Sequence, residues 1–258
     1  MPVKFINMTE QDFIQNKLIH KNCSLENCFD LLQNRRIWFA NPTTWHDPFE
    51  SLFLTSKYKK ASGRITEHPW RRRVFATCMT ETATCEAYWN VYSQQQIGMS
   101  LAIKREVLLD ELKRYSLNTN TTIFIGKVEY QRTSNIVGRL ADNPFISPYL
   151  SSAGIRTEEA KVRLLLLKRS AYDYENEIRF FIVKKKPNDL NGIHVNFSCQ
   201  PTDLIDTITI DPNVKENVFE LIKEKLINQY NFANYSPKHR RVLKSLLYTP
   251  PRAKVFSL

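Results

Sequence analysis

An α+β fold, with a central and mostly antiparallel sheet flanked by helices, is the class that this sequence predicts. Strand-like and helix-like segments intermix without the regular strand–helix–strand period of a doubly wound protein. The chain has neither a GxGxxG nor a P-loop motif, which disfavours a parallel nucleotide-binding sheet. Its 258 residues are 42% hydrophobic, enough for one elaborated domain over the whole chain with a large core.

The N-terminal half contains most of the expected strands. Thr9, with Asp12 three positions later, predicts a capped helix over 11–18, and Ser24 caps a second helix that ends near Asn34. Residues 57–69 read as an exposed loop within a basic segment, 57–73. The other expected elements are strands at Val3–Asn7, Arg36–Ala40, Val74–Met79, Gly98–Ile103 and Thr121–Tyr130, and helices at Cys85–Tyr92 and Arg105–Tyr115.

The C-terminal half begins with an irregular insertion over 134–152, where Pro and Ser replace any periodicity. After it we expect helices at Thr157–Ser170 and Val214–Tyr230 and strands at Glu175–Val183 and Ile205–Ile210. Residues 232–258 read as a basic tail, with six Lys or Arg and no acidic residue.

The charge favours a polyanionic partner, and nucleic acid first. Lys and Arg number 37 against 26 Asp and Glu, which gives a net charge of +11. Clustered cations release counterions from a phosphate backbone together. The alternative is an ordinary basic surface. The candidate nucleic-acid contacts are Lys59, Lys60, Arg71, Arg72, Arg73, Lys238, Arg240 and Arg241.

Several classes of protein are disfavoured. The N-terminus mixes charged and apolar residues, unlike a secretory signal, and no run approaches 18 apolar residues, so we expect a cytoplasmic protein without a membrane span. The five cysteines include no CxxC pair and fit reduced thiols. The five histidines include no HxH or HxxxH pair, so no metal is expected.

Two stretches are rich in residues suited to ligand binding. The first, residues 38–50, holds Asn41, Asp47 and Glu50 together with two X-Pro steps, which is typical either of a shaped ligand loop or of a structural turn. The second is the helix at 85–92, where Tyr88, Trp89 and Tyr92 form an aromatic wall. Such rings stack on a nicotinamide or a nucleobase, although the same spacing also suits a core.

The sharpest pattern is Glu175-Asn176-Glu177-Ile178-Arg179. In a strand, Glu175, Glu177 and Arg179 point to one face, while the apolar residues that alternate with them point to the core. Two carboxylates side by side raise each other's pKa unless a cation compensates. We therefore predict either a solvated face or a site built on an acid pair.

The order of these motifs resembles a large bacterial family of uncharacterised function. Its members carry an NDPFE-type motif, a WSxYA…GF motif and an EKExR motif in that order. Here they correspond to residues 46–50, to Trp89–Tyr92 through Gly98, and to Glu175–Arg179, the last within a K-x-x-x-Y-x-Y-E-N-E run. The resemblance covers about residues 3–230. His46 stands where the family has Asn, and Asn90 where it has Ser.

A more distant resemblance is to the ADP-ribosyltransferase fold of DarT-like proteins, in which a Glu on a late strand holds the ribose of NAD. It implies Glu177 as the catalytic residue, Glu175 as its acceptor-side partner, and NAD as substrate without a metal. Cleavage of the nicotinamide–ribose bond passes through an oxocarbenium-like state that a carboxylate stabilises. The expected NAD contacts are Arg36, Asn41, Asp47, Glu50, Trp89, Tyr92 and Arg179.

The leading hypothesis is thus an ADP-ribosyltransferase-like enzyme that modifies RNA or DNA, as a bacterial toxin or anti-phage effector with a neutralising antitoxin. A second hypothesis is a nucleic-acid-binding module without catalysis, in which the two glutamates only partner Arg179. A third is a metal-dependent nuclease in which Asp47, Glu50, Glu175 and Glu177 gather around Mg²⁺.

Overall fold

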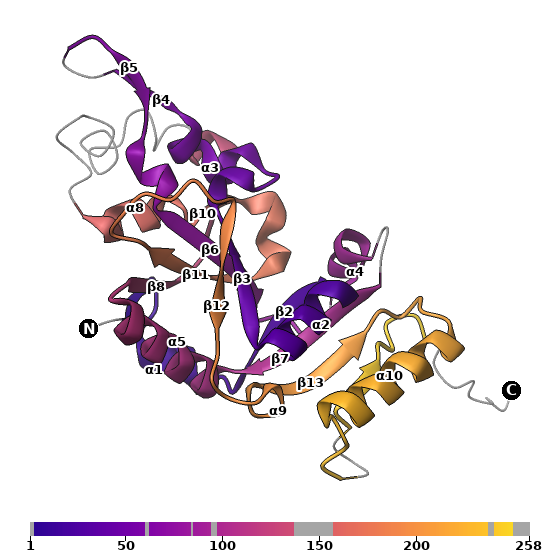
Figure 1. The fold of residues 1–258 in the computed structure, drawn as a ribbon. Coiled ribbons are helices and arrows are strands. Elements are labelled where there is room, and N and C mark those ends of the chain that lie inside the picture. The colour runs from indigo at the N-terminus through magenta and orange to yellow at the C-terminus, as the bar shows by residue number, and fades with distance from the viewer. Residues whose placement is uncertain are drawn as a thin grey trace, which may run out of the picture.

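The computed structural model describes residues 3–59, 62–83, 85–93, 97–136, 157–236 and 240–249. Helices pack on a large sheet (Figure 1). Its strands are β1 (Val3–Ile6), β2 (Leu18–Ser24), β3 (Arg36–Ala40), β6 (Val74–Thr80), β7 (Gly98–Lys104), β8 (Thr122–Lys127), β11 (Glu177–Val183), β12 (Gly192–Asn196), β13 (Ile205–Ile210) and β14 (Val242–Lys244). Two small two-stranded sheets pair β4 (Lys57–Lys59) with β5 (Ile65–Glu67), and β9 (Glu129–Gln131) with β10 (Leu167–Arg169).

The helices connect these strands and cover the sheet. Among the described residues, the α-helices are α1 (Glu10–Gln15), α2 (Leu25–Asn34), α3 (Pro48–Thr55), α4 (Glu86–Tyr92), α5 (Arg105–Thr119), α8 (Glu158–Leu164), α9 (Pro201–Leu204) and α10 (Glu216–Tyr230). The 3₁₀ turns of the same residues are η1 (Pro42–Thr44), η2 (Pro69–Arg72) and η3 (Ser170–Glu175). Thr9 and Ser24 cap α1 and α2 as predicted. No helix within the described ranges is long and apolar enough to cross a bilayer.

The predicted α+β class with a mostly antiparallel sheet is confirmed. The main path runs β1-β8-β11-β6-β2-β7-β13-β14, and every pair is antiparallel except the two outermost, β1 with β8 and β13 with β14. Strand β11 lies between β6 and β8 and is buried along its whole length.

The sheet splits on the far side of β6. There β2 pairs with β6 only at His20↔Thr80, and β3 pairs with it only at Ala40↔Ala76. Between these two points β2 continues with β7, and β3 continues with β12. The edge of β6 at Thr77 and Cys78 therefore faces an opening in the sheet rather than a neighbouring strand.

Strand β11 separates two apolar clusters. Ile178, Phe180 and Ile182 belong to the larger cluster, under the helices of the N-terminal half. Phe181 and Val183 belong to a smaller one with Trp70 and the segment 164–166. Phe180 and Phe181 are both fully buried, and each contributes about 2 kcal/mol by leaving water. Because both faces are covered, Glu177 and Arg179 point into protein and not into solvent.

Several predicted elements need correction. The strand expected from Glu175 begins at Glu177, because Asn176 takes a left-handed conformation (φ 40°) that ends η3. The strand expected over 121–130 breaks at Val128, whose N–H bonds the Glu177 carbonyl, and β9 then pairs with β10. The helix expected over 157–170 ends at Leu164, because four consecutive leucines cannot lie on one helical stripe.

The segment 57–69 forms the β4–β5 hairpin rather than an irregular loop, and the tail expected from 232 contributes β14 to the sheet. Helix α10 begins at Glu216, close to the predicted start. Most of the insertion expected over 134–152, and the last residues of the tail, lie outside the described residues.

Candidate active site

Two distant sequence motifs meet in one buried ion cluster. Asp47 caps α3, whose first turn places Glu50 against Arg179 of β11. The Arg179 Nη2 atom lies 2.5 Å from Glu50 Oε2 and 2.7 Å from Glu177 Oε2, and its Nη1 donates to the Leu165 carbonyl at 2.7 Å. Its guanidinium also lies over the Trp45 ring at 4.5 Å. Arg179 is thus held by protein groups on all sides and orients the Glu177 carboxylate.

Lys168, from β10, is the second cation of this cluster. Its ammonium lies 2.6 Å from Glu175 Oε2, 3.1 Å from Glu50 Oε1 and 3.5 Å from Glu177 Oε2. Lys168 is 4% exposed and Arg179 is fully buried. Buried carboxylates are stable only when such partners compensate for lost water.

The cluster contains three carboxyl groups and only two cations, so one proton balances its charge. Burial and the neighbouring Glu177 raise the pKa of Glu175 to about 7. Burial would also raise the pKa of Glu177, but Arg179 and Lys168 together bring it below its ordinary value. Near neutral pH the pair therefore consists of an ionised Glu177 and a Glu175 that can take up or release a proton.

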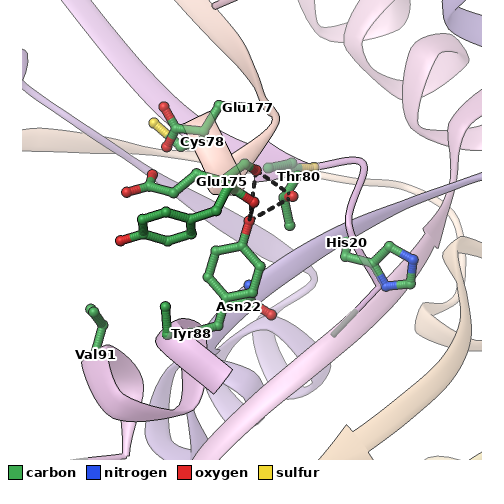
Figure 2. A pocket seen from close by; sticks show the side chains of 11 residues that line it. His20, Asn22, Cys78, Thr80, Tyr88, Val91, Glu175 and Glu177 are labelled. Atoms are coloured by element: carbon green, nitrogen blue, oxygen red, sulfur yellow. Dashed lines mark hydrogen bonds between the residues drawn. The ribbon is translucent and has the colours of Figure 1, made fainter. Parts of the chain in front are cut away.

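The turn that carries Glu175 is clamped to the opposite wall by α4. The Tyr88 hydroxyl rises from α4 and donates to the Glu175 carbonyl at 2.6 Å, and Thr80 Oγ1 donates to the same carbonyl at 2.6 Å (Figure 2). Burial raises the pKa of Tyr88 to about 12, so it remains a donor. These bonds fix the backbone of Glu175, which ends the η3 turn, and so hold its side chain beside Glu177.

The two glutamates line a pocket with aromatic and polar walls. Tyr88 and Tyr174 form the aromatic side, and His20 and Asn22 of β2 form the polar side, with Cys78 beside Glu177 (Figure 2). The pocket contains about 440 Å³ of empty space including its mouth. Burial, with Glu177 adding to it, raises the pKa of the Cys78 thiol to about 12, so Cys78 is not a thiolate nucleophile.

A wider groove occupies the split in the sheet and joins the pocket through the shared Asn22 and Cys78. On one side, the Lys21 ammonium donates to Thr77 Oγ1 at 2.9 Å, and no carboxylate of the described residues pairs with it. Burial lowers the pKa of Lys21. An ammonium in this position favours an anionic ligand.

On the other side of the groove, Trp38 presents an aromatic platform. Its indole is 45% exposed, packs edge-on to His194 at 4.8 Å between ring centroids, and lies against Gly192, where a Cβ would come within 2.1 Å of the ring. Arg36 also lines the groove and binds Asp30 through two nitrogens, with Nη2 at 2.6 Å from Oδ1. The groove thus combines cations with an open ring face.

Comparisons with known proteins give a likeness in structure and none in sequence. No family model matches the chain, and no curated protein matches it. Among solved structures, the chain is similar to DarT of Thermus sp. 2.9 in complex with NAD⁺, with 12% sequence identity and a TM-score of 0.36. That likeness covers 89% of this chain and 95% of the other. A likeness at this level does not establish a shared activity.

The structure brings Glu175 and Glu177 together at a pocket wall, though not as neighbours on one strand. Of the expected NAD contacts, only Arg36 lines the joined hollows. Glu50 and Arg179 bind each other and line neither hollow, so their ligand contacts stay predictions. Asp47 caps α3 and pairs with Arg169 at 3.2 Å.

Two further residues expected to contact NAD are buried. Asn41 is 6% exposed, and its side chain bonds Thr43 and the Arg71 carbonyl, so it holds η1 in place. Trp89 is 4% exposed and packs against Gly98, on the side of α4 away from the pocket lining. The Tyr92 side chain lies outside the described residues.

The residues predicted to contact nucleic acid also include buried residues, exposed residues and residues outside the described ranges. Arg241 is 3% exposed and donates to the Thr202, Ile205 and Asp206 carbonyls, so its side chain is bound inside the protein and its nucleic-acid contact stays a prediction. Arg71, Arg72 and Arg73 each pair with one acidic side chain, and Arg240 is exposed. The Lys59 side chain, Lys60 and Lys238 lie outside the described residues.

The sequence reasoning missed the residues that only folding brings to the site. His20, Lys21 and Asn22 lie in a strand whose sequence shows no local sign of a functional site, and Tyr174 reads as one more aromatic residue. Lys168 did have a signal, because it begins the K-x-x-x-Y-x-Y-E-N-E run of the family motif. Its position seven residues before Glu175 marks it as part of the same unit.

The donor set does not fit the metal-dependent nuclease. Glu50, Glu175 and Glu177 converge on the Lys168 ammonium, and Asp47 turns to Arg169 instead. Among the residues that the structure describes, no group of three or more His, Cys, Asp or Glu side chains is arranged to hold a metal ion. The position that Mg²⁺ would need between the carboxylates is taken by a side-chain cation.

Proposed function

We propose that this chain cleaves NAD at the nicotinamide–ribose bond and transfers the ADP-ribosyl group to a nucleic acid. The observation that carries the proposal is the acid pair of unequal protonation, Glu175 and Glu177, on the wall of a pocket lined by Tyr88 and Tyr174. The sequence resemblance to ADP-ribosyltransferases, with Glu177 on a late strand, supports the same assignment.

The two carboxyl groups suit the two halves of such a transfer. When the bond between the ribose carbon and the nicotinamide nitrogen breaks, its electron pair leaves with neutral nicotinamide and positive charge develops on the ribose. The Glu177 carboxylate, fixed by Arg179, stabilises that charge. Glu175 then accepts the proton of the attacking hydroxyl or amine as the new bond to the ribose carbon forms, and its pKa of about 7 suits a general base.

The joined hollows suit the whole dinucleotide. A nicotinamide ribose in the pocket places the ADP end in the groove, where Lys21 is the available cation for the pyrophosphate and Trp38 is the available platform for the adenine. Arg36 joins Lys21 there by exchanging its partly exposed pair with Asp30 for the pyrophosphate. Glu50, Lys168 and Arg179 act behind the pocket, as positioning residues for the acid pair.

The test is incubation with NAD, alone and with RNA or DNA, followed by measurement of nicotinamide release and of mass gain on the nucleic acid. Wild type should release nicotinamide, and Glu177→Gln should lower the rate about 100-fold or more. Glu50→Gln removes another buried partner of Arg179 and Lys168 without lining the pocket, so it should reduce stability similarly and the rate less. Glu106→Gln, an exposed glutamate of α5, should match wild type.

Activity of Glu177→Gln equal to that of Glu106→Gln would contradict the proposal. Absence of nicotinamide release, together with salt-sensitive nucleic-acid binding and no thermal stabilisation by NAD, would instead support the non-catalytic binding module. Mass gain on protein but not on RNA or DNA would keep the enzyme and exclude the nucleic-acid acceptor.

A cytoplasmic toxin or anti-phage effector is the biological role that we propose for such an enzyme. An enzyme that modifies nucleic acid harms its own host when it is free, so the proposal includes a neutralising partner. Co-expression with neighbouring genes, followed by purification of the chain, should recover that partner and abolish nicotinamide release. Growth of host cells that is unaffected by the wild-type chain alone would contradict the toxin role.

A further inference from the structure

Two basic runs that lie far apart in the sequence come together at one end of the central strands. The segment Arg71–Arg73 precedes β6, and Lys184–Lys186 follows β11. The Lys184 N–H donates to the Arg73 carbonyl at 2.8 Å, and Arg73 Nε donates to the Lys184 carbonyl at 2.7 Å. We call this region the basic end; the sequence alone indicated only its first run, within the basic segment 57–73.

The basic end is hollowed. A groove between the β4–β5 hairpin and Pro187 contains about 970 Å³ of empty space including its mouth, and Lys57, Arg71 and Arg72 line it. The Asn188 N–H donates to the Arg72 carbonyl at 2.7 Å, which fixes the far wall to the near one. A concave surface of this kind can follow a chain of phosphates rather than touch one.

Exposed ion pairs leave much of this charge available. Glu67, Asp189 and Glu158 pair with Arg71, Arg72 and Arg73, but the pairs of Arg71 and Arg72 involve acids that are 49% and 74% exposed. Such pairs are weak and exchange readily for phosphate. Lys185 and Lys186 are exposed, and no carboxylate of the described residues pairs with either.

The basic end lies at the opposite end of the β6–β11 pair from the acid pair. Thr80 pairs with Glu177 at one end and Val74 with Val183 at the other, six residues away. At about 3.3 Å per residue the separation is roughly 20 Å. A single nucleotide cannot reach from one to the other, but a strand with a rise of about 3.4 Å per stacked nucleotide covers it in about six nucleotides.

From this charge, shape and spacing we propose that the basic end, formed by Lys57, Arg71–Arg73 and Lys184–Lys186, binds the phosphate backbone of the acceptor nucleic acid. It holds the strand about six nucleotides from the nucleotide presented to Glu175. The inference rests on the proposed transfer to nucleic acid and adds an anchoring surface to it. Phosphodiester chemistry alone is recognised here, so the surface takes RNA and DNA alike.

The test compares two double variants of equal charge. Lys185→Gln/Lys186→Gln removes two cations of the basic end, and Lys17→Gln/Lys215→Gln removes two exposed lysines elsewhere. Binding of fluorescent single strands of 4 and 20 nucleotides is measured by anisotropy across a salt series. For the 20-mer, the basic-end variant should bind at least 5-fold more weakly, and its salt slope should fall by about 1.4. The control variant should stay within 2-fold of wild type, and the 4-mer, which is too short to extend from the basic end to the acid pair, should bind every protein more weakly than the 20-mer.

Nicotinamide release without nucleic acid separates this inference from the proposed function. It should be unchanged in both double variants, because neither pair of lysines lines the pocket. Equal weakening of 20-mer binding by the two variants would overturn the anchoring surface while leaving the enzyme intact. Tight binding of an acidic protein but of no oligonucleotide would overturn it as well.

Discussion

Replacement of Lys168 by methionine should change how the activity depends on pH. Met keeps most of the side-chain volume and removes the ammonium that lies within 3.5 Å of Glu50, Glu175 and Glu177. That ammonium favours the ionised form of Glu175, so its loss raises the pKa of Glu175 further above about 7. A nearby cation shifts a carboxyl pKa by about 1–3 units, so the shift should be at least about one unit.

The same substitution should destabilise the fold. Removal of one partner from a buried ion pair lowers stability by about 3–5 kcal/mol, which for a chain of this size is a fall in Tm of about 10 °C. Glu175 has a folded pKa above its unfolded value, so its unfavourable contribution is absent below about pH 4.5 and grows as pH rises through the folded pKa. The Tm difference between Lys168→Met and wild type should therefore be larger at pH 8 than at pH 5.

The assay is nicotinamide release and transfer from pH 5 to pH 9.5, measured below the Tm of every variant. Lys161→Met is the matched control, because Lys161 is also buried, lies 3.6 Å from Glu158 and sits over Trp70 at 5.6 Å. It should lower stability without moving the acidic limb of the transfer profile. Lys168→Arg keeps the charge and should keep the limb within about half a unit of wild type.

The proposed role of Lys168 fails if folded Lys168→Met has the acidic limb of wild type. It fails equally if Lys161→Met shifts the limb by the same amount, since a general loss of packing would then explain both. A shift in nicotinamide release without a shift in transfer would place the effect on Glu177 instead of Glu175.

Three further outcomes follow from the structure. Glu175→Gln should abolish transfer but stabilise the fold at pH 8, by up to about 3 kcal/mol in the free energy of unfolding, with a higher Tm. The reason is that it removes a carboxyl whose raised pKa disfavours the fold as pH rises through about 7. A Tm below that of wild type at pH 8 would contradict this. Glu111 accepts hydrogen bonds from the Ser198 and Cys199 N–H groups; although burial opposes them, these bonds and Arg114 lower the pKa of Glu111 to about 2. The stability that Glu111 contributes should be complete above about pH 4.5 and lost as pH falls toward 2. Glu111→Gln should therefore lower the free energy of unfolding in urea by about 2–3 kcal/mol at pH 7 and by little at pH 2.5. Trp38→Ala should weaken NAD binding, measured by calorimetry, about 10-fold without lowering the Tm. Tyr248→Ala, which removes an exposed ring on the C-terminal segment, should change neither the affinity nor the Tm. An unchanged affinity in Trp38→Ala would contradict the role of Trp38 as the adenine platform.

Local chemistry along the chain determined much of the fold. The caps at Thr9 and Ser24, and the apolar alternation of Ile178, Phe180 and Ile182, depend on residues within one turn or one strand. Such patterns act over a few residues, so the sequence alone predicts them. The acid pair was predictable for the same reason, because Glu175 and Glu177 are near neighbours in the chain.

The tertiary structure decided which of these residues line a cavity. The sequence suggested Arg179 and Glu50 as ligand contacts, but a second apolar cluster covers their face of β11, and both side chains bind protein groups there. Lys21 gained its place from the split beside β6, which depends on where β2 and β3 leave that strand. Burial, ion pairing across 129 positions and the separation of two strands are properties of the packed molecule, and no local pattern records them.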